Sequence, residues 1–358
     1  MNQNTNWIKQ ALTKINTDFN RSTDTHLIKF DAHSLSGIDL YFKDETTHPT
    51  GSLKHRLARS LFLFALCNGW LEEGTTVVEA SSGSTAVSEA YFAKLLGLPF
   101  IAVMPRSTSP DKITAIEFYG GKCFLVDNPA SIYDVSHKIA QETQGHFMDQ
   151  FTYAERVTDW RGNNNIAESI FQQMSEERFP TPKWVVMSAG TGGTSATIGR
   201  YIRYKQLESQ LCVTDVDYSV FYDCFTQKRR DLVIEQASRI EGIGRPRCEA
   251  SFIPGAIDHM LRIPDAASLG AMHVLAQRLG RRPGGSTGTN FYGVCQLAQQ
   301  MLSQQELGSI VTLICDSGER YGQTYYNEEW LLKNELDIQP YVEQINHFLD
   351  FGEWIPVS

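Results

Sequence analysis

A strand, a polar loop and a helix follow one another repeatedly along the first half of the chain. The β-branched run 75–80 is followed by hydroxyl-rich residues 81–85 and then by the helical pattern 86–96. The order recurs with strand 99–104 and helix 110–119, and with strand 122–127 and helix 132–143. Since parallel strands need crossover connections of this kind, the repetition predicts an α/β fold with a mainly parallel sheet flanked by helices.

The alternation breaks in the polar stretch 152–165 and resumes with strand 183–187, so two domains are expected in 358 residues. The predicted domains are residues 34–157, and residues 1–33 together with 158–358, with a C-terminal extension from about 323. Further expected elements of the second half are helix 195–205, strand 217–222, a polar helix at 230–236 and strand 310–314. Because ligands of such sheets bind beyond the carboxyl ends of strands, the loops are expected to face a shared cleft.

The charge and the cysteine pattern argue against several classes of partner. The chain has 32 basic and 41 acidic residues, a net charge of −9 and no basic tract, so neither nucleic acid nor an anionic membrane surface is an expected partner. It has neither a signal-peptide pattern nor an apolar run of about 18 residues, which predicts a cytoplasmic protein. Seven cysteines without a Cys-x-x-Cys pair indicate neither a disulfide framework nor a metal site.

Lys54 lies in a turn, residues 49–56, between the extended run 37–43 and the helical pattern 57–64. A lysine held between two rigid elements can be aimed at a ligand. The alternative is a solvated surface charge, which is the usual state of a lysine beside His and Arg.

Gly190, Thr191, Gly192, Gly193 and Thr194, here called the glycine loop, follow a strand and open a helix. Their backbone N–H groups and the helix N-terminus predict a phosphate cradle, although an ordinary tight turn has the same pattern. Ser195 stands where a dinucleotide fingerprint requires glycine, and no P-loop motif occurs. The loop therefore fits a single phosphate better than NAD or ATP.

Ser81, Ser82, Gly83, Ser84 and Thr85, here called the hydroxyl loop, also connect a strand to a helix. Four hydroxyls with backbone donors suit a carboxylate ligand, whereas N-capping would account for one or two of them. Ser317 follows the last strand, where it offers one hydrogen bond at the cleft or is a simple turn residue. A lysine, a monophosphate cradle and a carboxylate cradle together indicate pyridoxal 5′-phosphate acting on an amino acid.

Five segments, in the same order, resemble motifs of the cysteine synthase and cystathionine β-synthase family of fold-type II pyridoxal-phosphate enzymes. They are residues 49–56, 81–85, 190–194, 241–244 and 317–321, and the resemblance spans roughly 26–322. It implies two α/β domains of the tryptophan synthase β type and a homodimer.

The resemblance also implies a role for each matching residue. Lys54 would form the Schiff base, and the glycine loop, Gly190, Thr191, Gly192, Gly193 and Thr194, would bind the cofactor's phosphate. Ser317 would contact the pyridine nitrogen. Ser84 stands at the position that contacts the ring hydroxyl, where the shorter serine would lose this contact or make it through water. Ser81, Ser82, Gly83, Thr85 and Gln150 would bind the substrate carboxylate.

Several departures make the chain resemble the family's stand-alone L-cysteine desulfhydrases more than its biosynthetic synthases. Ser84 stands where the synthases usually have asparagine, and segment 150–156 lacks their usual prolines and asparagines. Arg245 follows Gly244, where it either narrows the cleft or forms a surface salt bridge. The helical pattern after Pro340 would pack on the body, cover the cleft or meet a second subunit.

Three functions follow, of which β-elimination of L-cysteine to hydrogen sulfide, pyruvate and ammonia is favoured. Lys54 would remove the Cα proton, and a serine at the pyridine nitrogen would promote loss of the leaving group. If the adjacent Asp316 were the ring partner, this electronic argument would reverse. The alternatives are a cysteine synthase using O-acetylserine and sulfide, and a catalytically silent ligand-binding protein, against which the intact Lys54 argues.

Overall fold

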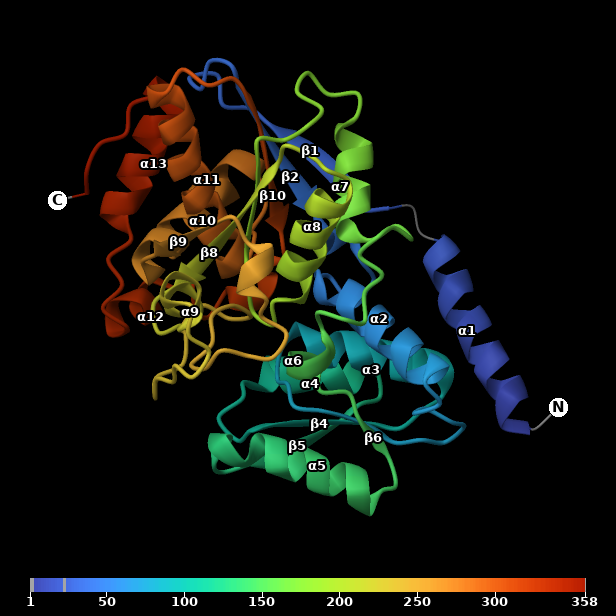
Figure 1. Cartoon of the computed structure of the whole chain (residues 1–358). Coiled ribbons are helices and arrows are strands. Elements are labelled where there is room, and N and C mark those ends of the chain that lie inside the picture. Colours follow the sequence, from blue (N-terminus) through green and yellow to red (C-terminus); the bar gives the residue numbers. More distant parts are fainter. Residues whose placement is uncertain (1–2, 22–23, 358) are drawn as a thin grey trace. The chain divides into compact units, whose positions relative to one another are not determined.

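The computed structural model of the chain describes residues 3–21 and 24–357, and it divides into two compact units (Figure 1). Unit 1 comprises Met1–Asp24 and His48–Thr158, and unit 2 comprises Thr25–Thr47 and Asp159–Ser358. Each unit contains one sheet. Residues 1, 2, 22, 23 and 358, which fall within the predicted domain ranges, lie outside the described residues.

Unit 1 is built on a four-stranded, wholly parallel sheet in the order β5-β4-β3-β6. The strands are β3 Val77–Glu79, β4 Phe100–Pro105, β5 Lys122–Val126 and β6 His146–Phe147. The helices are α1 Gln3–Arg21, α2 Lys54–Cys67, α3 Ser84–Leu96, α4 Pro110–Phe118, the 3-10 turn η2 Pro129–Ser131, α5 Ile132–Glu142 and α6 Gln150–Tyr153.

Side chains of β3 alternate between the two faces of this sheet, as the pleat of a strand requires. Val77 packs in a core with Ala11, Ile15 and Phe62, residues of α1 and α2. Val78 packs on the other face with Ile139 of α5, the helix that runs along β4, β5 and β6 in Figure 1. Both faces are therefore covered, which explains why consecutive residues of the strand, Val77 and Val78, are both apolar.

Unit 2 contains a six-stranded sheet in the order β1-β2-β10-β7-β8-β9, in which only the β1–β2 pair is antiparallel. The strands are β1 His26–Phe30, β2 Ile38–Asp44, β7 Trp184–Ser188, β8 Gln210–Val216, β9 His259–Ile263 and β10 Gly308–Ile314. The α-helices are α7 Ile166–Met174, α8 Gly193–Tyr204, α9 Phe221–Gln227, α10 Asp265–Leu279, α11 Gly285–Ser303, α12 Glu328–Lys333 and α13 Gln339–Phe351. The 3-10 turns are η1 Glu45–Thr47, η3 Pro254–Ala256 and η4 Gly318–Tyr321.

The C-terminal helix α13 belongs to the core of unit 2. Its Ile345, Phe348 and Leu349 are buried in one cluster with residues of α10 and α11, and the three helices lie together in Figure 1. Of the three expectations for the tail, simple packing is therefore confirmed.

The predicted α/β class with mainly parallel sheets is confirmed, but two predicted elements of the second half are wrong. The strand expected at 217–222 lies earlier, as β8, where Leu211, Cys212 and Val213 are fully buried, and α9 starts at Phe221. Residues 230–236 form a loop instead of a helix, because the Arg230 guanidinium donates to the carbonyls of Glu249 and Phe252. Tertiary hydrogen bonds thus override the local helical pattern.

The compact units differ from the predicted domains near the N-terminus. Residues 25–47 lie in unit 2 because β2 pairs with β10 along its whole length, and α1 lies in unit 1 because Ala11 and Ile15 are buried there. The second boundary, at Thr158, falls within one residue of the expected position. Among the described residues, no helix is long and apolar enough to cross a membrane.

Candidate active site

Lys54 is the first residue of α2, and its position is fixed by a buried polar network. Gly51 turns the chain with φ of +70°, a conformation that glycine adopts without strain. The buried Thr50 hydroxyl then forms hydrogen bonds with Nδ1 of His55, at 3.1 Å, and with the Ser88 hydroxyl, at 2.9 Å. Because Ser88 belongs to α3, this network ties the lysine turn to the helix that the hydroxyl loop opens.

The hydroxyl loop lies between β3 and α3, with Gly83 at the N-cap of the helix. The N-cap is thus a glycine, so the alternative that the hydroxyls serve as N-cap residues does not hold. Ser81, Ser82 and Ser84 are half-buried, and Ser81 Oγ accepts a hydrogen bond from the Gly83 N–H at 3.2 Å.

Thr85 and Gln150, predicted from separate parts of the sequence, meet in unit 1. The Thr85 hydroxyl donates to Oε1 of Gln150 at 2.8 Å, and both residues are buried. Gln150 opens α6 directly after Asp149, whose φ of +48° turns the chain there. The hydrogen bond therefore sets the amide of Gln150 beside the hydroxyl loop.

Two fully buried glutamates behind this loop were missed by the sequence analysis. Glu79 ends β3, and its carboxyl oxygens accept hydrogen bonds from the N–H groups of Ala80, at 2.7 Å, and Gln150, at 3.3 Å. Glu89 lies on α3 and faces Glu79. Burial raises the pKa of both carboxyls above the ordinary value of glutamate, and the charge of each raises the pKa of the pair further. A glutamate inside an apolar strand was the available signal.

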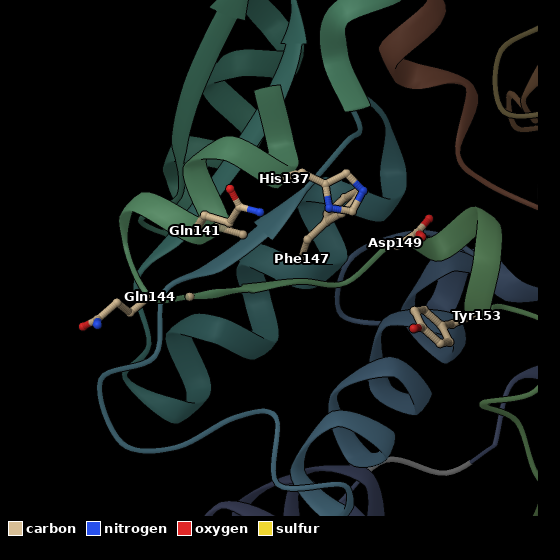
Figure 2. A pocket seen from close by; sticks show the side chains of 8 residues that line it. His137, Gln141, Gln144, Phe147, Asp149 and Tyr153 are labelled. Atoms are coloured by element: carbon tan, nitrogen blue, oxygen red, sulfur yellow. The ribbon is translucent and has the colours of Figure 1, made fainter. Parts of the chain in front are cut away.

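A groove of about 460 Å³ lies on unit 1 beside α5 and α6. Figure 2 shows His137 and Phe147 in its middle, with Gln141 on one side and Asp149 and Tyr153 on the other. Its remaining lining residues are Ala140, Gln144 and Gly145. The groove adjoins the predicted site through Asp149, the neighbour of Gln150.

The glycine loop of unit 2 connects β7 to α8. Gly192 is the N-cap of α8 with φ of +88°, and the N–H of Gly193 points to Thr191 Oγ1 at 3.3 Å. Thr191, Gly192 and Gly193 are buried, and Thr194 is half-buried. The positive end of this 12-residue helix therefore opens at the loop.

Glycine is required at two positions of this loop. A Cβ on Gly190 would collide with the carbonyl oxygen of Gly242, and one on Gly192 would lie 2.6 Å from Cα of Phe252. The N–H of Gly244 also donates to the carbonyl of Ala189 at 2.9 Å. The predicted segments 190–194 and 241–244 therefore pack backbone against backbone.

The donors at this loop fit a phosphate group. They are backbone N–H groups at a helix N-terminus and the hydroxyls of Thr191 and Thr194, which bind an anion without adding a competing carboxylate. Ser188, the last residue of β7, has a buried hydroxyl with no hydrogen-bond partner among the described residues. Such a group is available to a ligand.

Ser317 lies after β10, and its neighbour Asp316 has a separate role. Ser317 caps η4 and pairs as an isolated bridge with Pro283, just before α11. The buried carboxylate of Asp316 accepts a hydrogen bond from the Tyr321 hydroxyl at 2.7 Å. Burial and the Asp316 charge raise the pKa of Tyr321 well above its ordinary value, so the hydroxyl keeps its proton.

Arg245 forms an ion pair. Its guanidinium contacts the Glu249 carboxylate at 2.8 Å, and Arg247 contacts the same carboxylate at 3.2 Å. The side chain of Glu249 is 5% exposed, so this cluster is partly buried. Arg245 was predicted either to narrow the cleft or to form a salt bridge, and the structure shows the salt bridge.

Known proteins are similar to this chain along most of its length. The profile of the family described as "Pyridoxal-phosphate dependent enzyme" matches residues 20–316. The L-cysteine desulfhydrase of Mycobacterium tuberculosis is 58% identical over 335 residues, 92% of this chain and 91% of the relative. The cysteine synthase of Dictyostelium discoideum is 29% identical and covers 88% of this chain and 85% of the relative.

Among solved structures, O-ureido-L-serine synthase is similar with a TM-score of 0.75 and 22% sequence identity. The match covers 86% of this chain and 96% of that protein. At this identity the likeness concerns the fold, and it agrees with the α/β architecture described above.

Proposed function

This chain belongs to the family of pyridoxal-phosphate dependent enzymes, and from that premise we propose that it catalyses β-elimination of L-cysteine. The products are hydrogen sulfide, pyruvate and ammonia, and one water molecule supplies the keto oxygen of pyruvate. The observation that carries the proposal is the 58% identity to an L-cysteine desulfhydrase along 92% of the chain. We therefore favour release of sulfide from L-cysteine over synthesis of L-cysteine from sulfide.

The cofactor-binding residues are those that the fold presents on strand-to-helix turns. Lys54 would hold the cofactor covalently, the glycine loop would bind its phosphate and Ser317 would face its ring nitrogen. Ser84 stands at the position that faces the ring hydroxyl, and its short side chain would reach that group through water or not at all. Bound pyridoxal phosphate withdraws electrons from the substrate Cα and so acidifies its proton. The uncharged donors of the glycine loop, its position at the N-terminus of α8 and the unpartnered Ser188 hydroxyl support the phosphate assignment.

Residues of unit 1 bind and orient the amino acid. The substrate carboxylate is assigned to the hydroxyls of Ser81, Ser82 and Thr85, the backbone of Gly83 and the amide of Gln150. In the structure the Thr85 hydroxyl donates to Oε1 of Gln150, so it would turn this proton toward the carboxylate when the amino acid binds. Orientation through the carboxylate presents the Cα–H bond to Lys54. The Nζ of Lys54 accepts the Cα proton, the Cβ–S bond breaks, and hydrosulfide leaves with the bonding electron pair.

Ser317 is favoured over Asp316 as the partner of the ring nitrogen. The Asp316 carboxylate is buried and accepts the Tyr321 hydroxyl, which leaves the half-buried Ser317 hydroxyl to face a ligand. A neutral hydroxyl does not stabilise a protonated ring. Ser317 would thus hold the ring nitrogen by one hydrogen bond without adding charge, which would favour loss of the β-substituent.

A cysteine synthase is the second candidate, because relatives of that name match with 29% identity over 88% of the chain. The same residues would then serve O-acetylserine, with sulfide adding at Cβ after acetate leaves. The catalytically silent binding protein is disfavoured, because Lys54 stands at the start of α2 within a buried supporting network.

The assembly, the compartment and the domains complete the proposal. A homodimer is supported by the family resemblance, and a cytoplasmic location by seven free cysteines, which reducing compartments preserve. The proposed division is into two catalytic domains, residues 34–157, and residues 1–33 together with 158–358. Sedimentation, cell fractionation and separate expression of each domain test these points.

The deciding experiment compares sulfide and pyruvate release from L-cysteine with cysteine formation from O-acetylserine and sulfide. It uses the purified, cofactor-loaded protein, with Lys54→Ala as the blank and Lys138→Ala, at an exposed position, as the matched control. Faster sulfide and pyruvate release supports the lyase. Faster cysteine formation, by about tenfold or more in kcat/KM, would overturn it in favour of the synthase.

A further inference from the structure

Glu79 and Glu89 carry an inference that deepens the proposed function and rests on its assignment of the hydroxyl loop to the substrate carboxylate. Each side chain is fully buried, with an exposed fraction of 0%. Neither carboxyl forms an ion pair with a lysine or arginine within residues 3–21 and 24–357. Buried carboxyls without a cation are rare, because desolvation of the charge is unfavourable.

Glu79 joins two segments of the carboxylate site. One carboxyl oxygen accepts the N–H of Ala80, the residue that precedes the hydroxyl loop, and the other accepts the N–H of Gln150. Ala80 and Gln150 lie far apart in the sequence, and Thr85 forms a second link to Gln150. Glu79 is therefore a bridge that sets the spacing between the hydroxyl loop and the Gln150 amide.

Glu89 supplies the proton that this arrangement needs. Both oxygens of Glu79 accept N–H groups, which is the pattern of a carboxylate. Both oxygens of Glu89 are buried without a hydrogen-bond partner among the described residues, and Glu79 is the charged group that acts on them. Two carboxylates in contact repel each other, so the pair retains a proton. A proton on Glu89 allows it to donate to Glu79.

Other titratable groups around the pair do not neutralise it. Asp149, in the turn before α6, adds a negative charge that raises the pKa of Glu79 further. On α2, His55 is bonded to Thr50, and on α5, His137 packs its ring on Phe147 at 4.8 Å. Strand β4, which pairs with β3, contributes only the apolar segment Phe100–Pro105. The proton that the pair retains is therefore what limits the negative charge next to the hydroxyl loop.

We propose that Glu79 and Glu89 share one proton and act as positioning residues of the amino-acid carboxylate site, so that amino-acid affinity falls when this proton is lost. With the proton present, the pair has one negative charge, which the N–H groups of Ala80 and Gln150 offset. Without it, two negative charges stand behind a loop that must receive an anion. Repulsion then weakens binding of the carboxylate.

The test measures the affinity of the cofactor-loaded protein for L-alanine, which has no β-leaving group, from the absorbance change on binding. The titration covers about pH 6 to about pH 9 for wild type, Glu79→Gln, Glu89→Gln and Glu73→Gln. Glu73 is an exposed glutamate of unit 1 and serves as the matched control. The ratio of each variant's affinity to wild type removes the titration of the ligand itself.

Glu79→Gln should weaken L-alanine binding about tenfold at about pH 6, because an amide presents only one acceptor to two N–H groups, and this deficit should narrow as wild type loses the shared proton at higher pH. Its amide hydrogen exchange at Ala80 and Gln150 should accelerate as well. Glu89→Gln keeps a hydrogen-bond donor for Glu79 and should bind within about twofold of wild type near neutral pH. Its affinity should fall less than that of wild type as the pH rises.

Affinity of Glu79→Gln within about twofold of wild type at about pH 6, or an unchanged pH dependence in Glu89→Gln, would overturn the inference. If Glu79→Gln does not fold, the pH series of Glu89→Gln decides alone. Failure of the proposed function is seen separately, as a wild-type protein that binds L-alanine but releases neither sulfide nor pyruvate from L-cysteine.

Discussion

The glycine loop and the hydroxyl loop have the same local design but different surroundings. Each connects a parallel strand to a helix whose N-cap is a glycine, Gly192 in one and Gly83 in the other. Gly192 has φ of +88° and is enclosed by the backbone of Phe252, whereas Gly83 has φ of −108° and open space within 4 Å among the described residues. An enclosed loop suits a permanently bound group, and an open one suits a ligand that enters and leaves.

The supports of the two loops also differ in kind. The glycine loop is held by main-chain partners, namely the Gly242 carbonyl and the Gly244 N–H. The hydroxyl loop is held by side chains. Glu79 accepts the N–H groups of Ala80 and Gln150, and the Thr85 hydroxyl donates to Gln150. Side-chain supports can be altered by one substitution, so the hydroxyl loop, the proposed substrate region, is more adaptable than the glycine loop, the proposed cofactor region.

The largest expected effect is at Lys54. Lys54→Ala should lower kcat for sulfide release about a thousandfold, because the group that accepts the Cα proton is lost. Steady-state kinetics and the absorbance of the bound cofactor measure this. The Lys138→Ala variant should have the same kcat as wild type. If the Lys54→Ala variant also had this kcat, Lys54 of unit 1 would not be the group that accepts the Cα proton.

Matched glycine substitutions test the comparison between the loops. Gly192→Ala should destabilise the protein by about 3 kcal/mol and abolish cofactor retention, because a left-handed backbone and an overpacked contact combine. Gly83→Ala should change stability by less than about 1 kcal/mol and alter mainly KM for L-cysteine. Urea unfolding and cofactor titration measure both. Equal losses in the two variants would show that the loops are equally enclosed.

The buried carboxyl pair predicts a pH dependence of stability located in unit 1. Because burial keeps a shared proton on this pair, the folded protein binds more protons than the unfolded one between the ordinary pKa range of glutamate and about pH 8. The free energy of unfolding should therefore fall as pH rises through that window, by about 1.4 kcal/mol per pH unit for each extra proton. Glu89→Gln should reduce this slope in urea unfolding, and a slope equal to that of wild type would contradict the assignment.

The smallest expected effect is at the Thr85 hydroxyl. Thr85→Val removes the donor to Gln150 with little change of volume, and KM for L-cysteine should rise about three- to tenfold while kcat changes little. Thr85→Ser retains the hydroxyl and should restore KM close to wild type. A fall in kcat alone would instead place Thr85 in the chemical step.

The local features of the fold could be read from the sequence. Strand-to-helix turns at 81–85 and 190–194 were identified from small and hydroxyl residues between apolar runs, and both lie where expected. Helices α10 and α11 were missed, because they are buried on most sides and so lack the polar face on which periodicity depends. The strand expected at 217–222 was displaced for a similar reason, since burial of β8 hides its boundaries.

The sequence by itself determined the α/β class and the order of the motifs, and it predicts the chemistry of Lys54 and the two loops, because these depend on residue types and short spacings. Only the tertiary structure decided that residues 25–47 belong to unit 2, that Gly242 closes on Gly190, and that Glu79 links Ala80 to Gln150. These features depend on contacts between segments distant in the chain. Such contacts are set by packing and strand pairing, which local propensity does not encode.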